Sequence, residues 1–170
     1  MKQLFGTDGI RGQANEYPMT AEMALQVGRA VVAYFSGPGT DARIVIGKDT
    51  RLSGDMLESA IVAGICAAGG NAYLTGVLPT PGVAFVTSSI KANAGIVISA
   101  SHNPYYDNGI KIFKGNGYKL SDEAEVEIEK IILDENRPVR QIDSRKVGTV
   151  QHYRPAQKDY LTFLKNSLSA

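Results

Sequence analysis

Three polar residues that could carry chemistry follow a strand-like apolar run in the middle of the chain. Ser101, His102 and Asn103 interrupt the stretch IVISASHNPYYDNGIKIF, which begins and ends with apolar residues. A serine hydroxyl in such a place can act as a nucleophile or carry a phosphoryl group. A serine after a strand can equally be a turn or capping residue. The pattern therefore raises a group-transfer hypothesis without deciding it.

Cationic side chains lie in two further glycine-containing stretches. Arg11 stands in FGTDGIRG, and KDTRLSG contains Lys48 and Arg51. Guanidinium and ammonium groups bind phosphate, and glycines let the backbone come close to a ligand. These residue types favour a phosphorylated ligand. The alternative for FGTDGIRG is a glycine-rich turn with a surface arginine.

Lys111 lies between Ile110 and Ile112 in a short alternating run. Since successive side chains of a strand point to opposite faces, the isoleucines should face the core and Lys111 the other side. One interpretation is a solvated lysine. The other is a cation or proton donor that points toward the Ser101 loop.

Other chemistries find less support in the sequence. A hydrolase elbow needs G-x-S-x-G, and SASHN has neither glycine, while His102 is directly adjacent to Ser101 and poorly placed as its base. The nucleotide motif G-x-x-x-x-G-K-[ST] and zinc-type Cys/His spacings are both missing. GPGTDA precedes a predicted strand, which reverses the dinucleotide context. A serine hydrolase is the weakest of the enzyme hypotheses.

The elements that must position these residues alternate between strand and helix patterns. The first part of the chain predicts a helix capped by Thr20, then a strand at 43–47, a helix at 55–68, a strand at 72–76, a helix at 81–91 and a strand at 95–100. This order predicts an α/β fold with parallel strands and right-handed crossovers. Ligands bind at the carboxyl ends of such strands. The loops after these three strands should therefore meet in one crevice.

The second part of the chain departs from this alternation. DNG at 107–109 predicts a turn before a short strand at 110–113, and GNG at 115–117 predicts another turn. Ser121 should cap a helix that ends near Leu133. Residues 134–148 are predicted to form a surface connection, and Pro155 to open a last helix.

Composition excludes several classes of protein. The 170 residues are 44% hydrophobic and 21% charged, with a formal net charge of +1. This balance gives no electrostatic case for binding nucleic acid or a membrane surface. The N-terminus has no long apolar signal segment, and no run of residues approaches a membrane span. We expect a cytoplasmic protein.

Four stretches together resemble the α-D-phosphohexomutases. They are FGTDGIRG, GKDTRLSG, LPTPGVAF and ISASHNPYYDNGIKIF, in this order, and the resemblance covers nearly the whole chain. The residues of these stretches are most similar to those of the bacterial branch that interconverts glucosamine 6-phosphate and glucosamine 1-phosphate. The alternatives are the glucose and mannose phosphate mutases of the same superfamily, or a non-catalytic phosphosugar-binding module.

The resemblance implies a fold and a domain plan. It implies a three-layer α/β/α domain with a mostly parallel mixed sheet, the first of four domains. Residues 1–140 would form this domain, and 141–170 would complete it and lead toward a missing second domain. The family's D-G-D-x-D-R metal loop is not in the sequence. The chain by itself is therefore expected to be inactive, and its last helix, with Tyr160, Phe163 and Leu164, to favour self-association.

The resemblance also implies residue roles. Ser101 would carry the phosphoryl group that passes to a hexosamine phosphate through a bisphosphate intermediate, with one Mg²⁺ bound to the phosphate on Ser101. Arg11 would hold phosphate, and Lys111 would be the general acid or base. His102 would hydrogen-bond the sugar or its phosphate, and Asn103 would shape the loop and contact phosphate. Organisation of the crevice from behind would fall to Lys48, Asp49 and Arg51.

Overall fold

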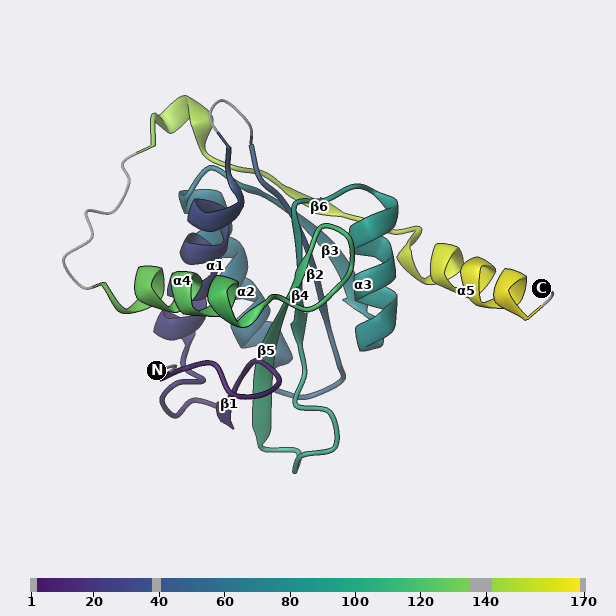
Figure 1. The fold of residues 1–170 in the computed structure, drawn as a ribbon, viewed down its shortest axis with the longest axis horizontal. Helices are drawn as coiled ribbons and strands as arrows, with labels where there is room; N and C mark the ends of the chain where they lie inside the picture. Colours follow the sequence, from purple (N-terminus) through teal and green to yellow (C-terminus); the bar gives the residue numbers. More distant parts are fainter. Residues whose placement is uncertain (1–2, 38–40, 135–141, 169–170) are drawn as a thin grey trace.

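A mixed sheet of six strands forms the centre of the molecule, with strand order β1-β5-β4-β2-β3-β6 (Figure 1). The computed structural model describes residues 3–37, 41–134 and 142–168. The elements in chain order are β1 (Ile10–Gln13), α1 (Ala21–Phe35), β2 (Arg43–Lys48), α2 (Gly54–Ala67), β3 (Asn71–Val77), α3 (Thr80–Ser89), β4 (Ala94–Ile98), β5 (Asp107–Lys114), α4 (Asp122–Leu133), the 3₁₀ turn η1 (Ser144–Lys146), β6 (Val150–His152) and α5 (Ala156–Ser167).

Strand directions follow from the lengths of the connections. β2 pairs in parallel with β3 and β4, because a helix returns the chain between β2 and β3 and between β3 and β4. β6 pairs in parallel with β3. β5 is antiparallel to both β4 and β1. The segment 99–106 between β4 and β5 is too short for a crossover helix. The predicted α/β fold with a mostly parallel mixed sheet is confirmed.

Helices cover both faces of the sheet and make three layers. Figure 1 shows α1, α2 and α4 on one side and α3 on the other, with α5 extending away from the body of the molecule. Alternate residues of β2 divide between two cores: Ile44 and Ile46 join α1, α2 and α4, while Val45 packs with α3. Each such buried aliphatic side chain stabilises the fold by about 1.5–3 kcal/mol. The sheet is therefore fixed from both faces.

Two glycines let α1 and α2 approach each other closely. A Cβ on Gly28 would lie 2.3 Å from the carbonyl oxygen of Ile61, and one on Gly64 would lie 2.1 Å from that of Leu25. Real Cβ atoms do not come this close to a backbone oxygen. Glycine at both positions therefore sets the distance between the helices. We call the segment 99–106 between β4 and β5, which carries Ser101, the serine loop. The start of α2 lies beside it, since Asn108, two residues after the loop, donates to Ser53 Oγ.

The predicted helix starts are confirmed. Thr20 Oγ1 accepts a hydrogen bond from the backbone N–H of Met23, and Ser121 Oγ accepts one from that of Ala124. Both side chains satisfy an amide that has no partner within its helix. The last helix, α5, begins at Ala156 directly after its N-cap residue Pro155, which agrees with the prediction that Pro155 opens it.

The prediction of a turn at 107–109 is wrong. These residues begin β5, and the chain reverses earlier, within 99–106. Asn108 is buried and donates to Ser53 Oγ at 2.8 Å. A Cβ on Gly109 would lie 2.8 Å from the carbonyl oxygen of Ser99. The glycine is therefore needed for close contact between strands. The sequence pattern of a turn does not distinguish this need for glycine from that of a turn.

Two edge strands were not predicted. β1 pairs with β5, and β6 pairs with β3. Both are short, and all three residues of β6 are exposed, so neither shows an apolar alternation long enough to predict a strand. The surface connection predicted at 134–148 lies partly outside the described residues, and its described part contains η1.

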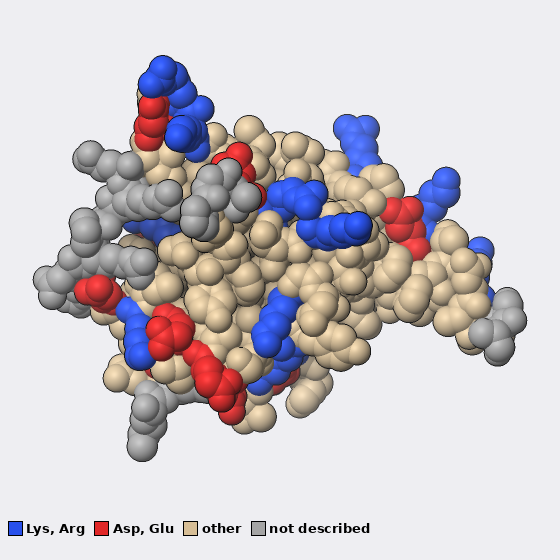
Figure 2. All heavy atoms as spheres, turned by 45° about the horizontal axis from the view of Figure 1, so that its top comes forward, with Lys and Arg blue, Asp and Glu red and all other residues tan. Residues whose placement is uncertain are grey.

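The described surface carries mixed charge. On the face drawn in Figure 2, positive and negative side chains lie scattered among larger neutral areas, in agreement with the net charge of +1. Among the described helices, none combines the length and the apolar character needed to cross a membrane.

Candidate active site

Ser101 projects from a constrained backbone three residues after the end of β4. Its φ of +57° lies in the left-handed region, where residues other than glycine are uncommon. The Ser101 side chain is exposed, and its backbone N–H donates to Ser99 Oγ at 3.1 Å. Strained backbone of this kind persists only where surrounding contacts enforce it, and it concentrates at functional sites. The position presents one hydroxyl to solvent on a fixed support.

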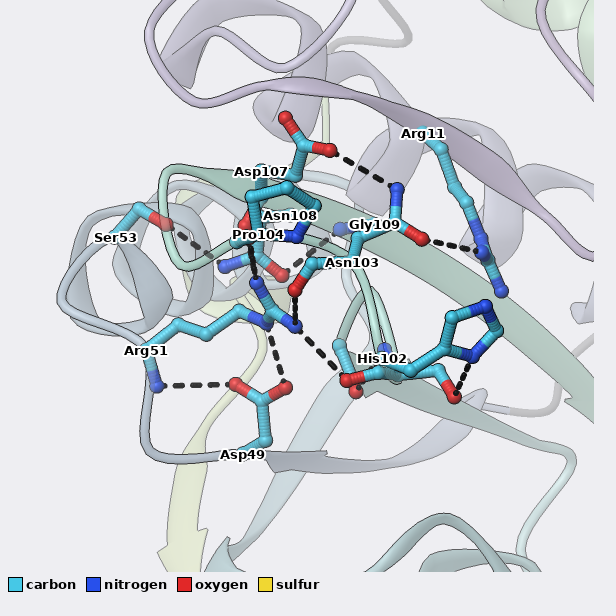
Figure 3. A network of polar contacts seen from close by, with 12 residues as sticks. Arg11, Asp49, Arg51, Ser53, His102, Asn103, Pro104, Asp107, Asn108 and Gly109 are labelled. Atoms are coloured by element: carbon cyan, nitrogen blue, oxygen red, sulfur yellow. Dashed lines mark hydrogen bonds and ion pairs between the residues drawn. The ribbon is translucent and has the colours of Figure 1, made fainter.

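Arg51 makes four of the hydrogen bonds that hold this loop (Figure 3). Its guanidinium donates to the backbone carbonyls of Ser101 at 2.9 Å and Asn103 at 3.0 Å. It also donates to the carbonyls of Pro104 and Asp107. The rigid fork of a guanidinium suits several acceptors at once. Arg51 therefore ties together both ends of the segment 101–107.

Asp49 and Asn108 complete the support beneath the loop. Asp49 accepts from Arg51 Nε at 3.0 Å and from the backbone N–H of Arg51 at 3.1 Å, which orients the guanidinium. Asn108 joins β5 to Ser53 at the start of α2. Asp49 and Arg51 were predicted to organise the site from behind. Both lie behind the loop that carries Ser101, where Asp49 binds Arg51 and Arg51 binds the loop carbonyls. Their part in a reaction stays a prediction.

Arg11 reaches the same loop from β1. Its Nη1 donates to Asn103 Oδ1 at 3.2 Å, and Asn103 Nδ2 donates to Asp107 Oδ2 at 3.0 Å. Arg11 Nε is buried and has no hydrogen-bond partner among the described residues. The pairing of β1 with β5, with Arg11 opposite Gly109, brings this guanidinium to the serine loop.

Lys111 enters the network through Asp8. The Lys111 Nζ lies 2.6 Å from Asp8 Oδ2, and Arg11 Nη2 lies 2.7 Å from the same oxygen. Ile110 and Ile112 are buried in the core, as the alternation predicts, while Lys111 lies on the opposite face of β5. The hydrogen bond from Lys111, together with the charges of Lys111 and Arg11, holds the pKa of Asp8 below its usual range despite partial burial.

His102 is exposed beside Ser101. Its Nδ1 lies 3.4 Å from Ser101 Oγ, at the outer limit of a hydrogen bond. Within the described part of the chain, no carboxylate makes a hydrogen bond to this ring. The geometry therefore lacks the relay that a serine hydrolase needs.

Lys48 is turned toward α2. Its Nζ forms ion pairs with Asp55 and Glu58. Burial, the largest single influence, lowers the pKa of Lys48, but hydrogen bonds and charge from Asp55 and Glu58 together raise it above the usual value. Lys48 thus joins β2 to α2 and stands behind the loop that carries Arg51.

Two supporting residues were missed in the sequence. Asp8 stands within FGTDGIRG, and its proximity to Arg11 was the available signal. Glu129 of α4 is almost fully buried and accepts the backbone N–H groups of Gln3, Leu4 and Phe5 at 2.6, 2.8 and 3.1 Å. Its only signal in the sequence was an acidic residue among the apolar positions Ile128 and Ile132 of the predicted helix. Glu129 anchors the segment that leads to Asp8.

The described residues do not form a metal centre by themselves. No group of three His, Cys, Asp or Glu side chains in the described ranges could hold an ion. Mg²⁺ prefers oxygen ligands, including phosphate and carboxylate. Ser101 could contribute an oxygen ligand, most strongly as a phosphate ester, and the carboxylates would have to come from elsewhere.

Comparison with known proteins places this geometry in a family. The model for "Phosphoglucomutase/phosphomannomutase, alpha/beta/alpha domain I" matches residues 2–138. The chain belongs to this family. A phosphoglucomutase/phosphomannomutase family protein from Burkholderia thailandensis superposes with a TM-score of 0.77 at 29% identity, over 92% of this chain and 34% of that protein. Parafusin from Paramecium, at 16% identity and a TM-score of 0.78, shares the fold.

Two curated relatives share one name. Phosphoglucosamine mutase from Syntrophus aciditrophicus is 57% identical over 169 residues, and that from Geobacter metallireducens is 54% identical over 171 residues. Each match covers 98% of this chain and 37% of the relative. This chain therefore spans little more than a third of the curated relatives that it matches.

Proposed function

We propose that this chain is the phosphoserine-bearing first domain of a phosphoglucosamine mutase. The observation that carries the proposal is the placement of Ser101. An exposed hydroxyl stands on a strained backbone fixed by Arg51, in the loop whose Asn103 binds Arg11. A hydroxyl held this way suits in-line transfer, which depends on positioning and on neutralisation of charge.

The proposed reaction has two balanced transfers. In the first, the bond between phosphorus and Ser101 Oγ breaks, a sugar hydroxyl oxygen bonds to phosphorus and gives up its proton, and Ser101 Oγ takes up one proton to become a hydroxyl. The product is a hexosamine bisphosphate. In the second, the bond between the other phosphorus and its sugar oxygen breaks, this phosphoryl group bonds to Ser101 Oγ, which gives up its proton, and the freed sugar oxygen takes up one proton. The net change interconverts glucosamine 6-phosphate and glucosamine 1-phosphate.

The surrounding residues divide the remaining work. Arg11 binds the phosphoryl group, since its guanidinium already lies at the serine loop. Lys111 moves the proton of the reacting oxygen, and His102 and Asn103 hydrogen-bond the substrate at the rim. Mg²⁺ supplies charge neutralisation at the phosphate on Ser101 when the full set of ligands is present.

The chain is proposed to act only as part of the longer protein. Residues 1–140 form the first domain, and residues 141–170 complete it and lead to the second. The exposed side chains of Leu161, Phe163 and Leu164 on α5 support a contact beyond this chain. The isolated chain is expected to show no mutase activity.

The substrate assignment rests on the difference in similarity. The relatives named phosphoglucosamine mutase are 54–57% identical to this chain, whereas the phosphoglucomutase/phosphomannomutase family protein from Burkholderia thailandensis is 29% identical. This difference supports a hexosamine phosphate over the phosphates of glucose or mannose.

The test is a phosphate map of the full-length protein. After incubation with Mg²⁺ and glucosamine 1,6-bisphosphate, peptide mass spectrometry should find phosphate on Ser101. Ser101→Ala should lose this phosphate and at least a thousandfold of the turnover, because the covalent carrier is gone. Ser59→Ala, which removes an exposed hydroxyl from α2, serves as the matched control and should behave as wild type. Near-normal turnover by Ser101→Ala would refute the proposal.

A further inference from the structure

One carboxylate oxygen joins two cations that come from different strands. Asp8 Oδ2 lies 2.6 Å from Lys111 Nζ of β5 and 2.7 Å from Arg11 Nη2 of β1. The Lys111 side chain is 13% exposed and that of Arg11 29%, so both cations are largely shielded from water. Without an anion between them, the two charges would repel each other more strongly than in bulk water.

The backbone around Asp8 is built to hold it in place. Gly9 has a φ of +87°, and a Cβ there would lie 2.4 Å from the carbonyl oxygen of Ile110, so only glycine fits. The N–H of Gly6 donates to the carbonyl of Gly9 at 2.9 Å, which closes the turn. Lys119 Nζ donates to the carbonyl of Thr7 at 2.6 Å. The contact between Asp8 and the two cations is therefore fixed from both sides of the turn.

The bridge leads to the serine loop. Arg11 donates a hydrogen bond from Nη2 to Asp8 and another from Nη1 to Asn103, which lies two residues after Ser101. A phosphoryl group on Ser101 or on a substrate carries roughly −1.5 to −2 charges and needs the same kind of donors. Asp8, half exposed, presents a single negative charge to these donors before any phosphate is bound.

We propose that Asp8 is a positioning residue that holds Arg11 and Lys111 together beside the serine loop and gives them up to the incoming phosphoryl group. This inference rests on the proposed function. It assigns Asp8 two opposing effects. The carboxylate keeps the cations in the geometry that transfer requires, and it competes with phosphate for them.

Replacement of Asp8 in the full-length protein tests both effects. Asp8→Asn keeps the size of the side chain and removes its charge. We expect kcat to fall about tenfold or more, and KM for glucosamine 6-phosphate to fall as well, because the competing charge is gone. Isothermal titration with inorganic phosphate should show about tenfold tighter binding. Asp143→Asn is the matched control. It removes the same charge from the Asp143–Arg145 pair, which lines a hollow at the opposite edge of the sheet, and it should leave kcat, KM and phosphate affinity unchanged.

Repeating the phosphate titration in an Arg11→Gln background shows whether the gain in phosphate affinity depends on Arg11. Asp8→Asn combined with Arg11→Gln should bind phosphate no more tightly than Arg11→Gln alone, since the released cation is no longer there. If Asp8→Asn fails to give the wild-type circular dichroism spectrum, Asp8→Ser takes its place in both measurements.

The outcomes separate this inference from the proposed function. Unchanged phosphate affinity in Asp8→Asn, or a raised KM together with the lowered kcat, would overturn the role of Asp8, because a residue that only supports the turn gives that result. A wild-type protein without mutase turnover would refute the proposed function. In that case, tighter phosphate binding by Asp8→Asn, lost in the Arg11→Gln background, would still support competition by Asp8.

Discussion

Arg51→Lys is the most direct perturbation of the device that holds the serine loop. The substitution keeps the positive charge but replaces the guanidinium, with its several fixed N–H donors, by a single ammonium group. Arg51 donates to four backbone carbonyls, those of Ser101, Asn103, Pro104 and Asp107. The single ammonium of a lysine can reach one or two of these, so two or three hydrogen bonds are lost. The segment should therefore open without unfolding of the domain.

The expected cost follows from the exposure of the loop. A net hydrogen bond contributes about 1 kcal/mol, and the released carbonyls can bind water because Ser101 and Pro104 are exposed. Loss of two or three bonds therefore costs about 2–3 kcal/mol of local stability. Since about 1.4 kcal/mol is a factor of ten, amides protected by the loop should exchange about 30- to 140-fold faster.

Hydrogen exchange of the full-length protein, followed by mass spectrometry, measures this effect. The informative amides are those of Asn103 and Asp107, which donate to the carbonyls of Ala100 and Pro104 at 3.1 Å each. Arg145→Lys is the matched control, because Arg145 is an exposed arginine bound only to Asp143 among the described contacts. Equal exchange in the wild type and Arg51→Lys would refute the argument that the fork holds this loop.

Two further predictions concern the scaffold. Glu129→Gln should lower the free energy of unfolding by about 1–3 kcal/mol in urea titrations of this chain, because an amide cannot accept three backbone N–H groups as the carboxylate does. Burial acts to raise the pKa of Glu129, but those N–H donors hold it below the ordinary 4.5, so the stabilisation is complete at neutral pH and is lost as pH falls below 4.5 through the folded pKa. The deficit should shrink in acid, and the exposed Glu127→Gln should show none; a deficit that stays constant with pH would contradict the role of the charge. Gly64→Ala should cost about 3 kcal/mol or more in the same titration, because its Cβ would lie 2.1 Å from the carbonyl oxygen of Leu25, and a stable variant would contradict the close packing of α1 on α2.

The sequence determined the parts of this protein that depend on local periodicity and capping. The helix that begins after Thr20 and the one from Asp122 to Leu133 are where the caps and apolar spacing predict them. The three central strands follow from continuous apolar runs between helices, and parallel strands then place the loop of Arg51 and the loop of Ser101 at one edge of the sheet. The four motifs also sufficed to predict the family.

Tertiary structure decided what depends on contacts between distant residues. DNG has the composition of a turn, yet the contacts of Asn108 with α2 and of Gly109 with Ser99 make it the start of β5. The four carbonyls bound by Arg51 lie 50 to 56 residues away in the chain, so no spacing in the sequence indicates them. Asp8 joins Arg11 to Lys111 only because β1 pairs with β5. Local sequence preferences determine where helices and strands form. The contacts between charged side chains on different strands depend on the sheet that pairs those strands.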